Sequence, residues 1–353
     1  MQAPSSLPPD RDPRSETAPA FSVLMAAYET EPYIEEAIHS VVAQTRSDWE
    51  LIIVDDGSPD GLVERVVPFL SLANVCLIRQ PNRGLAAARN RAASVARGRY
   101  LAVLDSDDAL LPDYLESVGA VLDGRPRTAM VACDALVYLE EPGRFRRRTY
   151  LRGPGVRPPR RPNPSRHLEH LLDHNFIYSG ATVRASAFAA VGGFDEELRA
   201  VEDWDLWIKI AARGVETSVI SRPLAVYRLR AGSLSRDAGG TYKLYEPSER
   251  MLTKALRELE LAPSARRIAK RTLAYCQRRA RLGDARAALA SGDVARARRL
   301  SEGAFRAQPT VKGALILAVL WLAPEPLREL QGRKLSAKRA VRFALARLSL
   351  RPG

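Results

Sequence analysis

Residues that build disulfide frameworks and metal centres are scarce in this sequence. Its 353 residues include three cysteines, Cys76, Cys133 and Cys276, which are far apart and form no C-x-x-C pair. This usage argues against a disulfide-rich domain or a zinc site and suits a reducing cytoplasm. Long apolar runs are also missing. The longest, residues 314–323, has about half the length that spans a bilayer, so we expect no transmembrane helix.

The N-terminal segment lacks the features of a targeting peptide. Residues 1–20 are rich in proline, serine and charged side chains and contain no apolar core of the signal-peptide type. We interpret this segment as a disordered lead-in and expect a cytoplasmic protein.

Positive charge is abundant, but only in one part of the chain. The whole chain has a formal net charge of +13. Residues 246–353 hold 24 Lys and Arg against 9 Asp and Glu, whereas residues 1–245 hold 30 against 32. A nucleic-acid-binding protein would carry a basic field on its main domain. We therefore expect no nucleic-acid partner and assign the positive field to the C-terminal region.

Short apolar runs alternate with helical patterns in the first part of the chain. The predicted strands and the helices between them cover residues 21–27, 32–44, 50–55, 75–78, 84–96 and 100–105. This alternation implies right-handed crossovers and an α/β fold with a mainly parallel sheet covered by helices on both faces. Ligands of such sheets bind at the carboxyl ends of the strands. Two acidic turns, residues 55–56 and 105–108, follow strands at that edge and are the first indication of function.

The remaining segments suggest a division into three parts. Residues 141–165 are rich in proline, glycine and arginine and predict an exposed loop. Nearly everything after residue 245 is helical in pattern, and residues 284–307 resemble a helix pair joined by Ser-Gly-Asp. We predict a disordered segment 1–20, an α/β domain 21–240 and a basic α-helical region 241–353.

The D-S-D-D sequence at residues 105–108 is the strongest local feature. Carboxylates at a strand end can converge on one hard cation and share it with phosphates. A divalent ion there would neutralise a diphosphate leaving group. A simpler interpretation is an acidic turn that caps the helix starting near Pro112, and the D-x-D pattern alone favours it.

Six short motifs occur in order, and the D-S-D-D sequence is one of them. They are V-L-M-A-A-Y-E-T-E (23–31), I-V-D-D-G-S (53–58), N-R-G-L-A-A-A-R-N (82–90), L-D-S-D-D (104–108), G-G-F-D-E (192–196) and E-D-W-D-L-W (202–207). Together they resemble the inverting family 2 glycosyltransferases with the GT-A fold, over residues 21–235. The resemblance implies a Rossmann-like domain that moves a sugar from a nucleoside diphosphate sugar, with a UDP-sugar as first guess, to an acceptor hydroxyl.

The resemblance also implies Mg²⁺ or Mn²⁺ as cofactor and a role for each matching residue. Those placed around the nucleotide sugar are Ala26 and Tyr28 at the nucleobase, Asp56 at the base edge, Arg89 near the nucleotide, Asp105 at the ribose and Asp107 as metal ligand. Tyr28 could equally be a plain core aromatic, but its position at a strand end beside Asp56 favours the site.

The Glu-Asp pair at residues 202–203 is where the family keeps its catalytic base. Inversion needs a carboxylate that takes the proton from the acceptor hydroxyl. The resemblance assigns this role to Asp203, with Glu202 and Asp205 as neighbours that could be mistaken for it. A simpler interpretation is that acidic residues are common at a helix N-terminus, where they stabilise the helix dipole. The two interpretations are compatible, because a catalytic base can lie at such a terminus.

One departure from the family concerns the usual Tyr-Arg-x-His sequence. Here residues 227–230 read Tyr-Arg-Leu-Arg, so Arg230 replaces the histidine, and residues 233–235 are Ser-Leu-Ser. Arginine cannot ligate a metal but can grip phosphate with two hydrogen bonds. The metal coordination is thus in doubt, while the diphosphate contact is not.

Three histidines between residues 167 and 174 have a spacing that invites a zinc interpretation. No cysteine is near them, and we prefer an ordinary amphipathic surface helix for His167, His170 and His174.

Two rival functions and one uncertain partner remain. A sugar-phosphate nucleotidyltransferase would share the sheet, but its Gly-rich basic loop is missing after residue 24. A non-catalytic nucleic-acid- or membrane-binding protein is disfavoured by the near-neutral main domain. The resemblance to the family, and not any single residue, implies a glycan or a lipid-linked sugar as acceptor, in bacterial surface polysaccharide or glycolipid synthesis. The C-terminal region, including an amphipathic stretch at residues 340–350, either packs on the catalytic domain or binds the anionic inner face of the plasma membrane.

Overall fold

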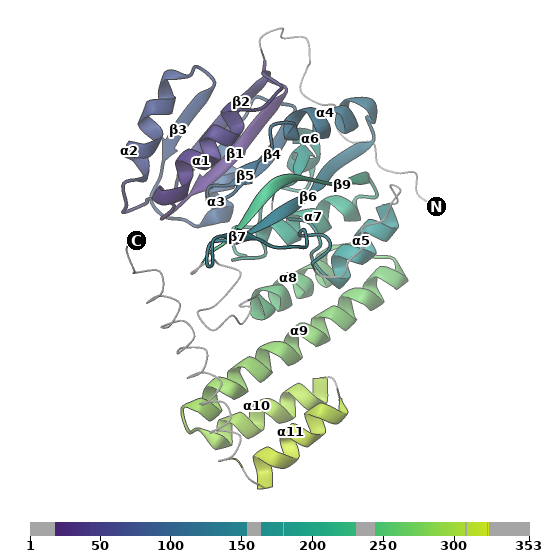
Figure 1. Cartoon of the computed structure of the whole chain (residues 1–353). Coiled ribbons are helices and arrows are strands. Elements are labelled where there is room, and N and C mark those ends of the chain that lie inside the picture. The colour runs from purple at the N-terminus through teal and green to yellow at the C-terminus, as the bar shows by residue number, and fades with distance from the viewer. Residues whose placement is uncertain are drawn as a thin grey trace. The chain divides into compact units, whose positions relative to one another are not determined.

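The structure, a computed structural model, describes residues 18–153, 164–178, 180–230, 244–307, 309–322 and 324 (Figure 1). The chain divides into two compact units, residues 1–231 with 254–269, and residues 232–253 with 270–353. The predicted domain boundary at residue 240 lies outside the described residues, as do Ser233, Ser235 and the stretch 340–350. The boundary and the tail helix therefore stay predictions.

Within the described ranges, nine strands form one sheet in the order β3-β2-β1-β4-β8-β6-β9-β5, with β7 paired to β6. The strands are β1 (Phe21–Ala27), β2 (Trp49–Asp55), β3 (Val75–Arg79), β4 (Tyr100–Asp105), β5 (Ala109–Leu110), β6 (Thr128–Leu139), β7 (Arg144–Phe145), β8 (Thr182–Arg184) and β9 (Glu216–Leu229). Strands β3, β2, β1 and β4 are all parallel. The α/β fold with a parallel, strand-and-helix first half is confirmed.

Helices alternate with the parallel strands, and α1 shows how one of them buries an apolar side. In α1 (Glu31–Val42), Ile34, Ala37, Ile38 and Val41 are all buried, a spacing that puts them on one helical face. The other helices are α2 (Leu62–Val66), the 3₁₀ helix η1 (Val67–Ser71), α3 (Leu85–Val95), α4 (Tyr114–Gly124), α5 (Pro164–Asp173), α6 (Ala185–Ala190), α7 (Glu202–Ala212), α8 (Tyr245–Glu258), α9 (Pro263–Ala290), α10 (Val294–Ala307) and α11 (Val311–Leu322).

The second half of the sheet is mixed and contains two long strands that the sequence pattern did not predict. β6 and β9 pair in parallel, with irregularities in register near Thr128 and Asp134. β8 is antiparallel to both β4 and β6, and β5 is antiparallel to β9. Because β5 directly follows the D-S-D-D turn, its pairing with β9 brings residues near 228 to that turn.

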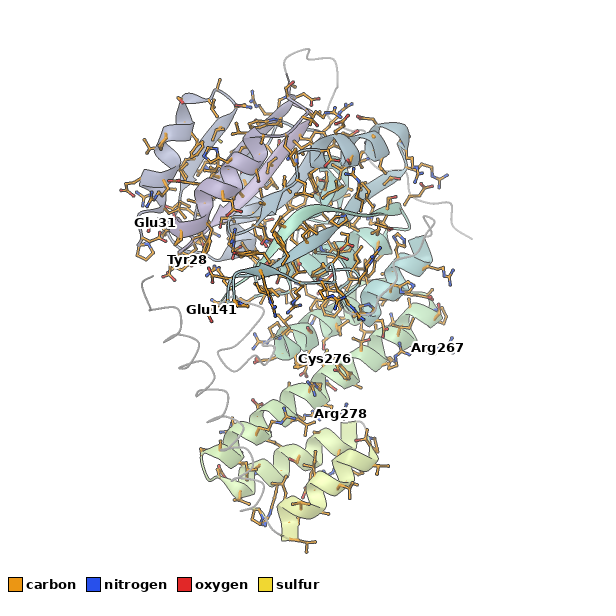
Figure 2. The ribbon with its side chains drawn as sticks, in the orientation of Figure 1. Tyr28, Glu31, Glu141, Arg267, Cys276 and Arg278 are labelled. Atoms are coloured by element: carbon orange, nitrogen blue, oxygen red, sulfur yellow. The ribbon has the colours of Figure 1, made fainter. Side chains whose placement is uncertain are left out.

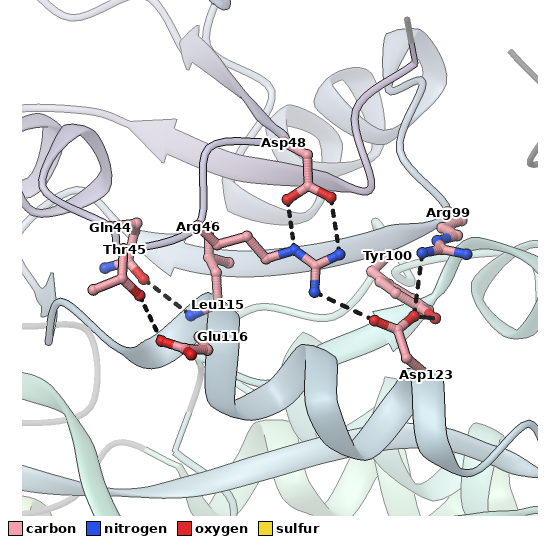
Figure 3. A network of polar contacts seen from close by, with 9 residues as sticks. All are labelled: Gln44, Thr45, Arg46, Asp48, Arg99, Tyr100, Leu115, Glu116 and Asp123. Carbon is pink, nitrogen blue, oxygen red and sulfur yellow. Dashed lines mark hydrogen bonds and ion pairs between the residues drawn. The ribbon is translucent and has the colours of Figure 1, made fainter. Parts of the chain in front are cut away.

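A polar network joins the C-terminal end of α4 to the start of β4 and to the loop before β2 (Figure 3). The Arg46 guanidinium donates to both oxygens of Asp48, at 2.5 and 2.8 Å, and to Asp123 Oδ2 at 3.3 Å. Asp123 Oδ1 accepts the Tyr100 hydroxyl at 2.7 Å and pairs with Arg99 at 3.2 Å. A single exposed ion pair contributes little to stability. Here, however, the Asp123 carboxylate joins α4 both to β4 and to the loop before β2, which holds the end of the helix in place.

The predicted helix pair at residues 284–307 is present as the end of α9 and the whole of α10. Gly292, at φ +88°, makes the turn, and Asp293 Oδ1 accepts the backbone N–H of Arg296 at 2.9 Å. Ala288, Leu289 and Ala297 pack with Leu320 of α11 in a small core. Among the described helices, none combines the length and apolarity needed to cross a membrane.

Candidate active site

The carboxyl ends of β1, β2 and β4 lie side by side because these strands are parallel and in register. Ala26 is buried in β1 and pairs with Val54 on one side and with Asp105 on the other. Tyr28 follows the end of β1 and is 42% exposed, so it is not a core aromatic (Figure 2). Its pKa is raised chiefly by the neighbouring Glu29 carboxylate. The predicted nucleobase residues Ala26 and Tyr28 therefore lie at the same sheet edge as Asp105.

Asp56 orders the loop that precedes α3. Its Oδ1 accepts Gln80 Nε2 at 2.7 Å and the Arg83 N–H at 2.9 Å, and its Oδ2 accepts the Gly84 N–H at 2.7 Å. The turn after it needs glycine, because Gly57 has φ +76° and an added Cβ would lie 2.9 Å from the Asn82 nitrogen. Three donors thus occupy most of the accepting capacity of this carboxylate.

Arg89 joins two carboxylates from distant parts of the chain. It is 1% exposed on α3, and its Nη1 donates to Glu202 Oε1 at 2.9 Å, while its Nη2 donates to Asp105 Oδ1. Burial lowers its pKa, but Asp105, Glu202 and Asp203 outweigh this effect and raise it. The D-S-D-D turn and the first turn of α7 are therefore held together by a permanently charged guanidinium.

This bridge predicts a large effect of Arg89→Met on stability. Two carboxylates would lose their buried counter-ion, and breaking a buried ion pair in this way costs about 3 kcal/mol or more. Urea unfolding followed by circular dichroism measures the change. Arg91→Met is the matched control, because Arg91 lies on the same helix with an exposed side chain. Equal urea midpoints for the two variants would contradict the proposed role.

The D-S-D-D turn receives its other cations from the end of β9. Arg230 Nε donates to Asp107 Oδ2 at 2.6 Å, and both side chains are about one-fifth exposed, at 21% and 20%. The Arg228 backbone N–H donates to Asp108 Oδ1 at 2.8 Å, and Arg228 Nε donates to the Asp107 carbonyl at 2.9 Å. Asp108 is buried, and burial raises its pKa well above its ordinary value. Asp107 is the more accessible of these two carboxylates.

Asp203 lies in the first turn of α7, beside the carboxylate held by Arg89. Its Oδ1 accepts the Trp204 N–H at 2.6 Å, and Asn175 Nδ2 lies 3.5 Å from its Oδ2. Burial and the adjacent Glu202 carboxylate raise the pKa of Asp203 to about 7. Its neighbour Asp205 is buried and pairs with Lys209 at 3.0 Å. Of the three acids in this turn, Asp203 combines partial exposure with a pKa suited to proton transfer near neutrality.

Two family models cover most of this structure. The model described as "Glycosyl transferase family 2" matches residues 22–191, and the one described as "Glycosyltransferase like family 2" matches residues 169–254. The chain belongs to glycosyl transferase family 2. The matched range contains every candidate site residue named above.

Curated proteins of this kind resemble the family 2 chain over part of its length. It is 37% identical over 127 residues to the putative glycosyltransferase EpsH of Bacillus subtilis, 36% of each chain. It is 32% identical over 230 residues to the succinoglycan biosynthesis protein ExoO of Rhizobium meliloti, 64% of this chain and 65% of ExoO. The chain thus spans about a third of EpsH and just under two-thirds of ExoO.

Solved structures share the fold of the family 2 chain at low identity. Residues 1–349 of S. aureus TarS, in complex with UDP-GlcNAc, match with a TM-score of 0.58 at 18% identity, covering 93% of this chain and 91% of that one. The mannosyltransferase PcManGT from Pyrobaculum calidifontis, in complex with GDP-Man and Mn²⁺, matches with a TM-score of 0.55 at 19% identity, covering 94% and 89%. These matches confirm the GT-A fold.

The structure also adds residues to the family 2 site that sequence reasoning missed. Asn90 Nδ2 donates to the Phe194 carbonyl at 2.9 Å, and Asn90 Oδ1 accepts the Phe194 N–H at 2.9 Å, which ties the A-R-N motif to the G-G-F-D motif. The Thr30 and Ser106 hydroxyls are 2.9 Å apart and join the ends of β1 and β4. Tyr33 lies under Arg228 and Arg230, with ring-to-Cζ distances of 5.2 and 5.3 Å. Thr30, Asn90 and Ser106 could have been found from the sequence, because each lies within one of the six quoted motifs.

The amphipathic helix predicted around the three histidines is α5, but His167 lies on its buried side and not on the surface. Its side chain is buried, its Nδ1 contacts the Thr217 hydroxyl, and burial lowers its pKa to about 4. His167, His170 and His174 all pack around the ring of Phe176, with centroids 6.2 to 6.4 Å away. The Phe176 ring therefore covers this side of α5. The spacing of the histidines in the sequence did not reveal this contact.

Proposed function

We propose that this chain is an inverting glycosyltransferase that moves a sugar from a nucleoside diphosphate sugar to an acceptor hydroxyl. The observation that carries the proposal is the Arg89 bridge, which brings Asp105 and the Glu202–Asp203 turn into one cluster. The sheet edge with Ala26, Tyr28 and Asp56 lies on one side of this cluster. A UDP-sugar is the first donor to test, and the TarS complex with UDP-GlcNAc supports that choice by fold alone.

In the proposed reaction Asp203 is the base. Its carboxylate takes the proton from the acceptor hydroxyl while that oxygen attacks the anomeric carbon from the face opposite the diphosphate. The bond from the anomeric carbon to the diphosphate oxygen breaks, and the nucleoside diphosphate leaves with the electron pair. A pKa near 7 leaves Asp203 largely ionised at slightly alkaline pH and still basic enough to accept the proton.

We place a divalent cation, Mg²⁺ or Mn²⁺, beside Asp107. The structure places no three His, Cys, Asp or Glu side chains of its described part where they could hold a metal together. Metals in phosphate sites, however, are often bound by one or two carboxylates plus substrate phosphates, and the accessible Asp107 offers such a carboxylate. When bound, the cation would neutralise charge on the leaving diphosphate. Arg230, already at Asp107, can donate two parallel hydrogen bonds to a phosphate.

The residues that we propose around the nucleotide differ in whether they contact it or act through another residue. Tyr28 is exposed enough to stack on a base, and Ala26 lies two residues before it in β1. Asp56 has little accepting capacity left beyond the loop at residues 80–84, so its contact with a base edge would be a single hydrogen bond. Arg89 is too deeply buried to meet the nucleotide and acts by holding Asp105, which we place at the ribose.

Surface polysaccharide synthesis is the context we propose. ExoO is named for succinoglycan biosynthesis, and TuaG of Bacillus subtilis, 42% identical over 101 residues that cover 28% of this chain and 40% of TuaG, for teichuronic acid biosynthesis. The acceptor would then be a glycan or a lipid-linked sugar. The three free cysteines suit the cytoplasm, where we place the protein, with its basic C-terminal region at the inner face of the membrane.

A screen of sugar donors tests this function without knowledge of the acceptor. Purified protein with Mn²⁺ and each of a panel of UDP-, GDP- and dTDP-sugars should slowly hydrolyse one of them, because water can replace the acceptor hydroxyl. Release of the nucleoside diphosphate is measured, with EDTA as control. Hydrolysis of none of the donors would contradict the proposal. A nucleotidyltransferase would instead release pyrophosphate from a nucleoside triphosphate and a sugar 1-phosphate, and that result would also overturn it.

A further inference from the structure

Helix α11 exposes a continuous apolar face. Six exposed aliphatic side chains recur along it at helical spacing: Val311, Ala314, Leu315, Ala318, Val319 and Leu322. Val311, Leu315 and Leu322 are 82%, 62% and 86% exposed. We call these six residues the α11 face. A helix normally turns such a stripe towards a protein core, so a fully exposed one indicates a partner.

The opposite side of α11 is already packed. Leu320 is buried with Ala288, Leu289 and Ala297, and Ile316 packs partly against the same cluster. The α11 face is therefore not the side that holds the helix in its unit. A 12-residue helix is about 18 Å long, too short to cross a bilayer of about 30 Å but long enough to lie in its interface.

The positive charge of α9–α11 indicates which kind of partner binds the α11 face. Residues 263–322, from α9 to α11, carry 13 Lys and Arg against 3 Asp and Glu, and the sequence of residues 325–353 adds 8 against 2. A second copy of this chain, or its own tail, would bring more positive charge to the face. A nucleic acid offers no apolar surface for six aliphatic side chains. An anionic lipid membrane matches both the charge and the apolar face.

Trp321 supports this assignment at the end of the helix. It is 56% exposed, and the Arg298 guanidinium lies 4.5 Å from the centre of its ring. Arg298 also donates to the carbonyl of Leu320 at 3.0 Å and to that of Trp321 at 3.2 Å. A tryptophan beside a cation, next to aliphatic side chains, is an arrangement suited to the boundary between lipid headgroups and acyl chains.

We propose that the α11 face inserts into the interfacial layer of an anionic membrane and that the basic residues of α9–α11 attract it there. The inference deepens the proposed function and rests on it in one respect, since membrane binding keeps the enzyme near a lipid-linked acceptor. The insertion itself does not depend on the proposed reaction.

Vesicle co-sedimentation of the full chain tests the proposal. We expect binding to vesicles of phosphatidylcholine with 30% phosphatidylglycerol at low salt, release as salt rises, and little binding to pure phosphatidylcholine. Leu315→Gln with Leu322→Gln should lower the partition coefficient at least tenfold, because both side chains leave the apolar phase. Val67→Gln with Leu70→Gln is the matched control, since these two apolar side chains are also exposed but lie in η1.

Tryptophan fluorescence locates the contact. Trp49, Trp204 and Trp207 are buried, so a blue shift on adding anionic vesicles would report Trp321. We expect this shift in the wild type and not in Trp321→Phe. Vesicle binding that is equal in wild type and the Leu315/Leu322 variant would overturn the proposal. So would a wild-type dimer that this variant makes monomeric, or binding to a DNA duplex in place of vesicles.

Sugar-donor hydrolysis without vesicles separates this inference from the proposed function. The Leu315/Leu322 variant should hydrolyse the sugar donor at the wild-type rate, which also shows that it is folded. Loss of vesicle binding with normal hydrolysis supports the α11 face as the membrane contact. A wild type that binds vesicles but hydrolyses no donor would contradict the proposed function and leave the membrane inference standing.

Discussion

Asp203→Asn is expected to lower kcat by about 10²- to 10⁴-fold, the usual contribution of a general base, with the KM for the sugar donor changed little. The amide keeps the shape of the side chain and its hydrogen bond from the Trp204 N–H, but it cannot take a proton from the acceptor. Steady-state kinetics with a saturating acceptor, or donor hydrolysis in its absence, measures the effect.

Glu202→Gln is the control and should stay active. Glu202 lies beside Asp203, but its Oε1 already accepts a hydrogen bond from Arg89 and is not expected to act as the base. An active Asp203→Asn together with an inactive Glu202→Gln would show that the base is the other residue. The pH profile gives a second check. Below the pKa of about 7 the base is protonated, so kcat/KM of the wild type should fall tenfold per pH unit there and level off above it. Asp203→Asn should lack this acidic limb.

Asp107→Ala is expected to abolish transfer, a loss of about 10³-fold or more, because the cation that balances the diphosphate charge would lose its protein ligand. The same change should remove the gain in UDP affinity that Mn²⁺ gives the wild type. Isothermal titration of UDP, with Mn²⁺ and with EDTA, measures that gain directly.

Asp113→Ala serves as the control for Asp107, since Asp113 is a surface carboxylate paired with Arg222. It should keep both activity and the Mn²⁺ effect. If the wild type turns over equally well in EDTA, the metal-dependent mechanism is wrong, although the fold and the base assignment would stand.

The parallel half of the sheet was predictable because its strands are nearly continuous apolar runs that end in polar turns. β1 and β2 are buried at every position, which is the pattern of strands covered on both faces. The helices between them show the spacing of one buried face. For these elements, local pattern and tertiary environment agree.

The long strand β9 was missed because its pattern is irregular. Arg222 and Pro223 interrupt it, and its exposure does not alternate along the strand. Its identity as a strand depends on pairing with β6, which a single sequence does not display. For the same reason the partners of the site carboxylates could not be predicted. Arg89 meets Glu202 across 113 positions, and Arg230 meets Asp107 across 123.

This long-range pairing has a consequence for the order in which the domain is made. A growing chain that has not yet emerged to residues 216–229 already contains β1 to β4 and the whole D-S-D-D turn. It lacks Arg228 in β9 and Arg230 just after this strand, the two cations that contact that turn. Closing so long a loop costs conformational entropy, which local contacts do not offset. Long-range contacts of this kind therefore form slowly. The acidic edge of the sheet is thus translated early and reaches its working geometry late, after the ribosome has made β9.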